Sequence, residues 1–499
     1  MKRFKMILSV ASAVSLFGAS ILTFAGCANN EEIITLRVCN WEEYIDLGGW
    51  DEEERIDLDS GDIFGVNTIY DDFAEWFNET HDFKVKVEYS TFGTNEDLYN
   101  RLSLGDVYDV VCPSDYMIMK LLAEDKLEEY SEEFASGEYS ANVSPYIDGV
   151  FTQYGWDKYA ACYMWGTTGI VYNPEKIDDV ADVSSWNILL NDNYNRQVTI
   201  KDNVRDAYFA ALGIINSELL TTQQFDTDAL SDIMNATDSE TIAKAEDVLK
   251  QIKDNVYSFE TDAGKADMVT GKVIANYQWS GDAITILDEA DADGTELWYS
   301  VPDECANLWF DGWVMLKNGI DGNEQRKTAA EAFVNFLSRP DNAIRNMYYI
   351  GYTSAIADET VFEYLDWNYG AEDGVETIEY NVSYFFGDDG EYVIYADAND
   401  FEMDENDEIN RGRQLFAQYP PENIKSRSVV MRDFEDKLTE INQMWINVRC
   451  LDVMDISPVT IGIICGAVGF IAIAGVLYGF RYKLFIKHKP KKGFKKVDE

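Results

Sequence analysis

Histidine and cysteine are both scarce in this chain of 499 residues. Only His81 and His488 occur, so a Ser-His-Asp triad, a Cys-His pair or a histidine zinc site would depend on His81. That residue lies in FNETHDFKV, a predicted helix-to-strand connection where a solvated histidine is expected. Hydrolases built on histidine are nearly excluded, and we expect no cofactor and no metal.

Apart from Cys27 and Cys465, the cysteines are widely spread, with no CxxC pair and an odd number. They are Cys39, Cys112, Cys162, Cys305 and Cys450. This pattern argues against a disulfide framework and against a zinc site.

Basic residues are few: 40 Lys and Arg stand against 91 Asp and Glu, a formal net charge of −51. Eleven of the basic residues lie near the two ends, which leaves the central part at about −60. Such a field repels nucleic acid and anionic substrates and attracts cations. Because soluble surfaces are often acidic, the charge permits a cationic ligand without indicating one.

Both ends of the chain carry long uncharged runs. MKRFKMILSVASAVSLFGASILTFAGC, residues 1–27, has the pattern of a secretory signal. Its last four residues resemble a lipobox, with Phe24 where leucine is usual, so we predict a lipoprotein-type signal peptide with lipidation at Cys27. The alternative is an ordinary signal peptide with an incidental cysteine.

Residues 459–480, VTIGIICGAVGFIAIAGVLYGF, contain no charged side chain and would reach about 33 Å as a helix, enough to span a bilayer core. The basic segment 481–499 follows, and such a segment stays cytoplasmic by the positive-inside rule. The sequence therefore predicts a C-terminal transmembrane helix, a short cytoplasmic tail, and an ectodomain on the outer face of a bacterial plasma membrane.

The central part alternates between strand and helix patterns. TLRVCNW, KVKVEYSTF and YDVVCPS are predicted strands, and NTIYDDFAEWFNETH, NEDLYNRLSLG and DYMIMKLLAEDKL are predicted helices. This order predicts an α/β unit with a largely parallel sheet. The pattern continues through a strand, YAACYMWGTTGIVYN, with an expected turn at 165–167, while 46–65 is expected to be a surface insertion and the region beyond 360 to be loops.

The stretch LRVCNWEEYID places an indole, two carboxylates and a phenol where the first strand ends. Ligands gather at the carboxyl ends of strands in α/β sheets, and carboxylates beside aromatic rings suit a cation with an apolar stem. Trp41, Glu42, Glu43 and Tyr44 are therefore candidate binding residues. Taken one by one, a tryptophan is more often core and an acid more often solvated surface.

Several segments together resemble one family, the spermidine/putrescine-binding proteins of bacterial polyamine ABC transporters. They are CNWEEYID, STFGTNEDLYNRL, YDVVCPSDYMIMKLL, YMWGTTGIVYN, YQWSGDA, WFDGWVM, FVNFLSRPDNA and IGYTSA. They stand in the family's order over about residues 33 to 360, and the resemblance continues weakly to about 450.

The resemblance implies a bilobed periplasmic-binding-protein fold of type II, with two α/β lobes joined by crossing hinge strands and closing over a ligand. The expected boundaries are 33–155 for the first part of lobe 1, 156–304 for the first part of lobe 2, 305–360 for the return to lobe 1, and 361–450 for the return to lobe 2 with a C-terminal helix.

The resemblance also implies a binding site between the lobes, lined by acids and aromatic rings. Its residues would be Trp41, Glu42, Glu43, Tyr44, Ser114, Asp115, Tyr116, Asp206, Trp279, Asp282, Trp309, Asp311 and Tyr352. Ammonium groups need carboxylates with good geometry, and the methylenes beside them pack on aromatic faces. Departures from the family pattern at Glu42, Asp115, Asn203 and Asp282 leave the choice between spermidine and putrescine open.

The predicted function is an extracellular receptor that captures polyamines and passes them to an ABC permease with a cytoplasmic ATPase. It would perform no chemistry, and would be held to the membrane by the C-terminal helix and an N-terminal lipid. The alternatives are a receptor for another cationic solute, an oligosaccharide receptor, and a surface glycosidase that uses paired carboxylates.

Overall fold

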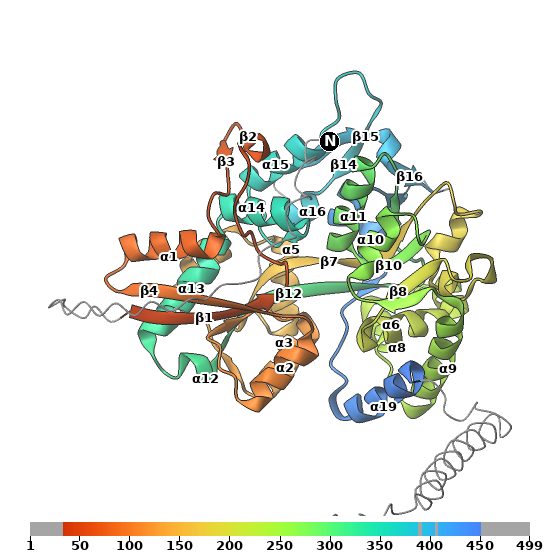
Figure 1. The fold of residues 1–499 in the computed structure, drawn as a ribbon, viewed down its shortest axis with the longest axis horizontal. Coiled ribbons are helices and arrows are strands. Elements are labelled where there is room, and N and C mark those ends of the chain that lie inside the picture. The colour runs from red at the N-terminus through yellow and green to blue at the C-terminus, as the bar shows by residue number, and fades with distance from the viewer. Residues whose placement is uncertain (1–32, 388–391, 405–407, 451–499) are drawn as a thin grey trace, which may run out of the picture. The chain divides into compact units, whose positions relative to one another are not determined.

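The structure is a computed structural model that describes residues 33–387, 392–404 and 408–450 (Figure 1). The chain divides into two compact units, Met1–Asn442 and Gln443–Glu499. Of the second unit, the structure describes the end of helix α19 (Leu438–Arg449) and Cys450. The predicted site residues all lie in the first unit.

One set of elements, here called the first lobe, is built on a parallel sheet. Strand β1 (Ile33–Trp41) pairs in parallel with β4 (Lys84–Phe92) and with β5 (Val110–Val111). The helices that follow these strands are α1 (Ile69–Thr80), α2 (Asn95–Leu104) and α3 (Asp115–Ala123). Thr68 and Thr94 begin α1 and α2, since each side-chain oxygen accepts a backbone N–H of the first turn. The predicted strand–helix order is confirmed.

Two long strands, β7 (Ala160–Tyr172) and β12 (Ala306–Leu316), run through the middle of the first unit (Figure 1). They pair antiparallel, and every residue in both is buried. One end of β12 pairs with β5 and with β6 (Leu127–Glu128) of the first lobe, while its other end pairs with β18 (Ser428–Val429). These are the crossing strands that the sequence predicted.

The pairing of β12 with β7 slips by one residue in its middle. Asp311 faces Met164, whereas the next residue, Gly312, faces Cys162. Such a bulge bends a strand and re-aims a side chain, and bulges are common beside binding sites.

The second lobe is built on the other end of β7. Strand β10 (Ala275–Trp279) pairs antiparallel with β7 and parallel with β8 (Val198–Lys201), which pairs with β9 (Ser258–Glu260). The remaining strands are β11 (Trp298–Ser300), which pairs with β7, then β17 (Ile409–Gly412) and β16 (Phe401–Met403). The helices are α6 (Val204–Ile215), α7 (Ser217–Thr222), α8 (Thr227–Met234), α9 (Ser239–Asn255), α10 (Ala263–Val269), α11 (Ser280–Ala292), α17 (Gln414–Gln418) and α18 (Glu422–Lys425).

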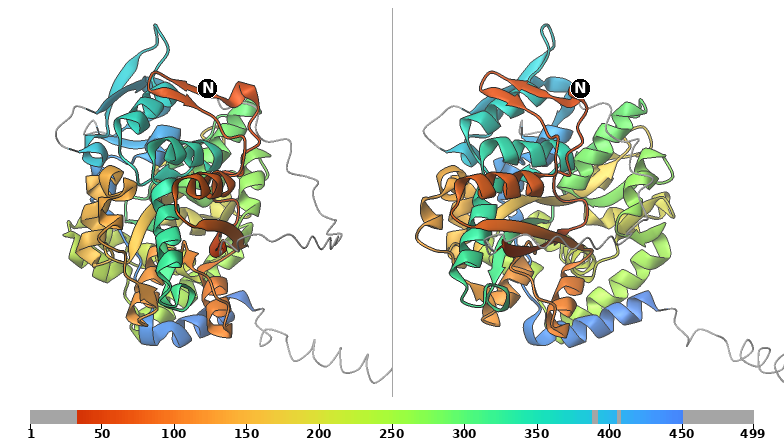
Figure 2. Two further views of the ribbon diagram at one scale, coloured as in Figure 1. Left: turned by 90° about the vertical axis from the view of Figure 1, so that its left-hand side faces the viewer. Right: turned by 60° about the vertical axis from the view of Figure 1, so that its left-hand side comes forward.

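Two hairpins add to this plan and lie at the same end of the first unit in both views of Figure 2. They are β2 (Ile56–Leu58) with β3 (Gly61–Ile63), and β14 (Thr377–Asn381) with β15 (Val393–Asp397). The remaining α-helices and strands described in this unit are α4 (Glu138–Asn142), α5 (Pro145–Tyr154), α12 (Lys317–Ile320), α13 (Glu324–Leu337), α14 (Pro340–Ile350), β13 (Thr353–Ser354), α15 (Glu359–Tyr369) and α16 (Ser383–Phe386). The expected surface insertion and loops thus contain regular structure, and the backbone N–H of Asp59 donates to Glu363 on α15.

The turn expected at 165–167 is wrong, because β7 continues straight through it. Gly166 serves close packing instead. A Cβ atom there would lie 2.2 Å from Ser280 Oγ and 2.7 Å from the Trp309 ring. The residue is glycine because an indole and a helix end approach the strand backbone at this point.

The prediction of a C-terminal transmembrane helix is corrected. Across residues 33–387, 392–404 and 408–450, no helix is long and apolar enough to cross a bilayer. The longest helix in these ranges, α9, has 17 residues and is rich in charge, whereas a span needs about 20 apolar residues. The predicted span 459–480 and tail 481–499 lie outside the described residues, as do the signal segment 1–27 and Cys27.

Candidate ligand-binding site

The centre of the site is the carboxylate of Asp311, at the bulge of β12. Its side chain is buried, with Ser114 Oγ donating to Oδ1 at 2.6 Å and Tyr44 Oη donating to Oδ2 at 2.8 Å. Burial raises the pKa of Asp311 to about 6, although both hydrogen bonds lower it. Among the described residues, no Lys, Arg or His lies within ion-pair distance of this carboxylate.

The parallel sheet brings the two hydroxyl donors to Asp311. Tyr44 follows the carboxyl end of β1, and Ser114 follows the carboxyl end of its neighbour β5 and begins helix α3. Ser114 and Asp311 also form an isolated backbone bridge. The site therefore forms where strand ends of the first lobe meet a crossing strand, as the strand-end rule predicts.

Aromatic rings cover this carboxylate. The rings of Tyr44 and Tyr352 meet edge to face with centroids 4.9 Å apart, and Trp309 lies 5.7 Å from Tyr352. Tyr352 Oη donates to Asp282 Oδ1 at 2.9 Å. Tyr352 therefore connects Asp311, through Tyr44, to an acid of the second lobe.

Gly281 lets the Tyr352 ring approach helix α11 closely. A Cβ atom on Gly281 would lie 2.3 Å from ring atoms of Tyr352. Gly281 thus gives the phenol ring of Tyr352 room against α11, and the next residue, Asp282, accepts from its hydroxyl group.

A second buried acid, Asp206, lies on α6 in the second lobe. It accepts from Trp279 Nε1 at 3.3 Å and from Tyr277 Oη at 3.4 Å. Burial raises the pKa of Asp206 to about 6, while the charge of Lys201 lowers it. The structure therefore brings Asp206 and Trp279 together.

Two lysines in the site were not predicted. Lys201 Nζ lies 4.1 Å from the centroid of the Trp279 ring and 3.8 Å from Asp282 Oδ2. Lys265 Nζ lies 3.4 Å from Asp282 Oδ1. Lys201 ends β8, so the strand-end rule that identified Trp41 could have identified it too, but nothing in the sequence marks Lys265 on α10.

Tyr116 and Asp115 take other roles. The Tyr116 hydroxyl contacts Asn95 and Glu96, and the Arg205 guanidinium carbon lies 4.2 Å from its ring centroid. Asp115 accepts two backbone N–H groups, from Tyr116 and Phe310. Burial raises the pKa of Asp115 to about 8, although both hydrogen bonds lower it. Through these two bonds, the carboxyl group joins the start of α3 to β12.

Trp41, Glu42 and Glu43 lie at the edge of the candidate site. Trp41 is half-buried, packs on Phe92 at 4.7 Å, and its Nε1 has no hydrogen-bond partner among the described residues. Glu42 and Glu43 are exposed in the turn after β1, where Glu43 has a φ of 52°. Burial lowers the pKa of Lys265, but the charges of Asp282, Asp262 and Glu43 outweigh it and raise this pKa.

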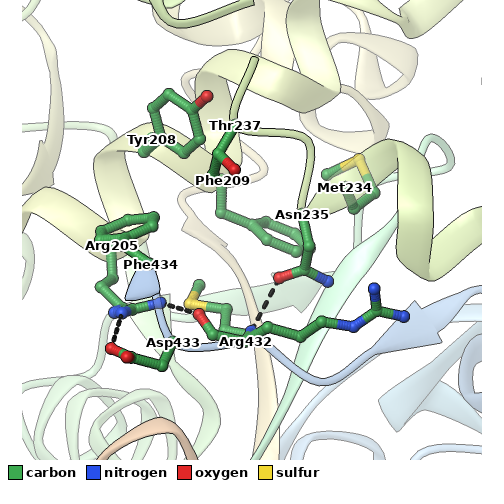
Figure 3. Close-up of a pocket in the computed structure, with 10 residues that line it drawn as sticks. Arg205, Tyr208, Phe209, Met234, Asn235, Thr237, Arg432, Asp433 and Phe434 are labelled. Carbon is green, nitrogen blue, oxygen red and sulfur yellow. Dashed lines mark hydrogen bonds and ion pairs between the residues drawn. The ribbon is translucent and has the colours of Figure 1, made fainter. Parts of the chain in front are cut away.

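A small cavity of about 20 Å³ lies beside Arg205 (Figure 3). Its walls come from α6, from the connection between α8 and α9, and from residues 431–434. Arg205 donates to the Arg432 carbonyl and lies 3.1 Å from Asp433 Oδ1, with the Phe434 ring centroid 3.7 Å from its guanidinium carbon. This arginine therefore ties the segment 431–434 to the helix that carries Asp206.

Two α/β lobes joined by crossing strands, with buried acids and aromatic rings at their junction, define a solute-binding protein. A family model described as bacterial extracellular solute-binding protein matches residues 72–360, more than half of the chain. The chain belongs to this family. It is a solute-binding protein and not an enzyme, which removes the glycosidase alternative.

Characterised relatives include polyamine-binding proteins. The chain is 28% identical to the spermidine/putrescine-binding periplasmic protein of Salmonella typhimurium over 271 residues, 54% of this chain and 70% of that protein. It is 25% identical to the putrescine-binding periplasmic protein PotF of Escherichia coli over 369 residues, 70% of this chain and 84% of that protein.

Solved structures show the same fold. The spermidine/putrescine ABC transporter substrate-binding protein PotD from Streptococcus pneumoniae superposes with a TM-score of 0.54 at 22% identity, over 83% of this chain and 98% of that chain. The predicted periplasmic-binding-protein fold is thereby confirmed. The lobe boundaries given above stay a prediction.

The predicted location is corrected together with the transmembrane helix. The relatives are named as periplasmic proteins, and no helix in the described ranges could cross a bilayer.

Proposed function

We propose that this chain captures a polyamine, spermidine or putrescine, and delivers it to an ABC permease driven by a cytoplasmic ATPase. The supporting relatives are named as binding proteins for these two polyamines. Lipidation of Cys27, outside the described residues, stays a prediction beside this proposal.

The observation that carries the proposal is the buried Asp311 carboxylate with no cationic partner among the described residues. A buried charge without a counter-charge is costly, and a ligand ammonium would supply one. An ionised carboxylate offers about four acceptor sites, and the two hydroxyl donors of Ser114 and Tyr44 leave about two for ammonium protons.

The surrounding rings suit the rest of such a ligand. Methylenes next to an ammonium group carry partial positive charge, and a cation–π contact contributes roughly 0.5–2 kcal/mol. Tyr44, Trp309 and Tyr352 supply these faces around Asp311. A sugar hydroxyl could also donate to Asp311, but only an ammonium group would supply the counter-charge that this carboxylate lacks.

The proposed ligand-binding residues fall into two groups. Those that the structure connects by hydrogen bonds, ring contacts or shared partners are Tyr44, Ser114, Asp206, Trp279, Asp282, Trp309, Asp311 and Tyr352. Trp41, Glu42 and Glu43 would line the edge where a ligand enters, and Tyr116 would position Arg205 beside Asp206.

The test is isothermal titration calorimetry of the purified full-length chain with putrescine, spermidine and, as a control, maltose. We expect saturable, micromolar or tighter binding of at least one polyamine and none of maltose. Asp311→Asn should lower the affinity by a factor of about 30 or more, since removal of one partner of a buried charged pair costs about 2–5 kcal/mol.

The matched control is Asp321→Asn, a residue at the end of α12 that contacts none of the proposed site. It should bind polyamine as the wild type does. No heat with either polyamine, or undiminished binding by Asp311→Asn, would contradict the proposal.

A further inference from the structure

Asp282 is already surrounded by the chain's own ammonium groups. Lys265 Nζ is 3.4 Å from one of its oxygens and Lys201 Nζ is 3.8 Å from the other. Tyr352 donates to the same carboxylate at 2.9 Å. Asp282 therefore differs from Asp311, which has only neutral donors.

Lys201 is held firmly in this position. It is fully buried, donates to the Thr261 carbonyl at 2.8 Å, and lies 3.7 Å from Glu260 Oε1. Its ammonium group also lies over the Trp279 ring, 4.1 Å from the centroid. A carboxylate together with an indole face is the arrangement expected for a ligand ammonium, and here a side chain of the protein occupies it.

Lys265 is less confined. Its side chain is 26% exposed, and it extends from α10 to Asp282 and Asp262, with the charge of Glu43 close enough to raise its pKa. Lys265 is therefore a second resident cation, at a more accessible place than Lys201.

The charges of this part of the site can be counted. Three buried carboxylates, Asp206, Glu260 and Asp282, lie close to the lysines, and the fourth, Asp311, lies apart from them. The four carboxylates and two lysines together carry a net charge of about −2 when all six are ionised. A ligand with two ammonium groups would neutralise this set, whereas one with three would bring an excess positive charge into a buried site.

We infer that Lys201 and Lys265 determine specificity: they occupy the Trp279–Asp282 half of the site as built-in ammonium groups, so that the chain selects a diamine over a triamine. The inference rests on the proposed function, because it assumes that the ligand is a polyamine. In this arrangement, the lysine ammonium groups stand where an ammonium group of a longer ligand would otherwise bind.

The experiment compares the affinities of the full-length chain for putrescine and spermidine at pH 7.5 by calorimetry. The wild type should prefer putrescine. Lys265→Met should raise the ratio of spermidine affinity to putrescine affinity by about tenfold or more, because Asp282 becomes available to a third ammonium. Lys265→Arg keeps the charge and should keep the wild-type ratio.

The matched control is Lys272→Met. Lys272 lies outside the site and pairs with Asp267 at 2.9 Å. Because the readout is a ratio of two affinities in one protein, a general loss of stability does not move it. An unchanged ratio in Lys265→Met, with both ligands still bound, would overturn the inference and leave the proposed function intact. A wild type that binds neither polyamine would overturn the proposed function itself, and the inference with it.

Discussion

Tyr44 and Asp311 are 267 residues apart in the chain, and the Tyr44 hydroxyl donates a 2.8 Å hydrogen bond to the Asp311 carboxylate. This contact joins the end of the first strand of the first lobe to a strand that runs on into the second lobe. Burial of the pair raises the pKa of Asp311 to about 6 and that of Tyr44 well above its usual value. The tyrosine therefore stays a hydrogen-bond donor, while the aspartate changes its charge within an accessible pH range.

Polyamine affinity should fall in mild acid. Asp311 and Asp206 both have a pKa of about 6, so each becomes neutral as the pH drops below 6 and loses its attraction for an ammonium group. We expect constant affinity between pH 7.5 and 8.5, and a loss of about tenfold per pH unit for each protonated acid below pH 6. Calorimetry from pH 8.5 to pH 5 measures this, and a flat profile would contradict the assignment.

Removal of the Asp311 charge should stabilise the ligand-free protein at neutral pH. The folded-state pKa is raised above 3.8, so the folded state binds a proton more tightly than the unfolded state, and the stability from this group is present at low pH and lost as the pH rises through 6. Relative to Asp311→Asn, the wild type should gain about 1 kcal/mol between pH 7.5 and pH 5. Urea denaturation of both proteins at the two pH values checks this. A difference that does not change with pH would mean that Asp311 is already neutral at pH 7.5.

Arg205 should hold the segment 431–434 in place. Its guanidinium group contacts Asp433, the Arg432 carbonyl and the Phe434 ring (Figure 3). In Arg205→Met, amide hydrogen exchange in this segment should become at least about tenfold faster, because the loss of these contacts lowers the local opening free energy by 1.4 kcal/mol or more.

The control for this variant is Arg432→Met. Arg432 pairs with Asp232 at the surface, where the two side chains are 46% and 72% exposed, so its contribution should stay below about 1 kcal/mol. Equal effects of the two substitutions on exchange would show that Arg205 has no special part in holding this segment.

Arg345 should stabilise the loop that follows Tyr44 and contains Asp46. Its guanidinium contacts Asp46, which is fully buried, at 2.6 Å and Asp72 at 2.8 Å. Arg345→Met would leave the Asp46 charge buried without a counter-charge, and we expect a loss of about 3–5 kcal/mol in the free energy of unfolding. The exposed pair Arg339–Asp341 supplies the control, since Arg339→Met should cost less than about 1 kcal/mol in the same urea titration.

Sequence patterns predicted the first lobe well because local rules decide it. Alternation marks β1 and β4, and α1 and α2 each begin after a threonine whose side-chain oxygen accepts a backbone N–H of the first turn. The rule that ligands gather at the carboxyl ends of strands led to Trp41 and Tyr44. This rule does not say which residue at a strand end turns inward: Tyr44 is buried against Asp311, while Glu42 and Glu43 face solvent.

The sequence could not predict features that depend on contacts between distant segments. Gly166 looked like a turn, but its role is set by Ser280 and the Trp309 ring, more than a hundred residues away. The lysines beside Asp282 were missed for a related reason. A search for the partners of a cation considers acids and rings, and only the three-dimensional arrangement shows that Lys201 already lies on Trp279.

The crossing strands also determine when the chain can finish folding. Ala306 of β12 pairs with Ser428 of β18, and Tyr299 of β11 pairs with Gly412 of β17, so the second lobe lacks strands until these late segments have been made. Strand partners so distant in sequence make folding slow, because much chain must be ordered before these contacts form. During synthesis, these late pairings should therefore be among the last parts of the fold to form, after residue 429 has emerged from the ribosome.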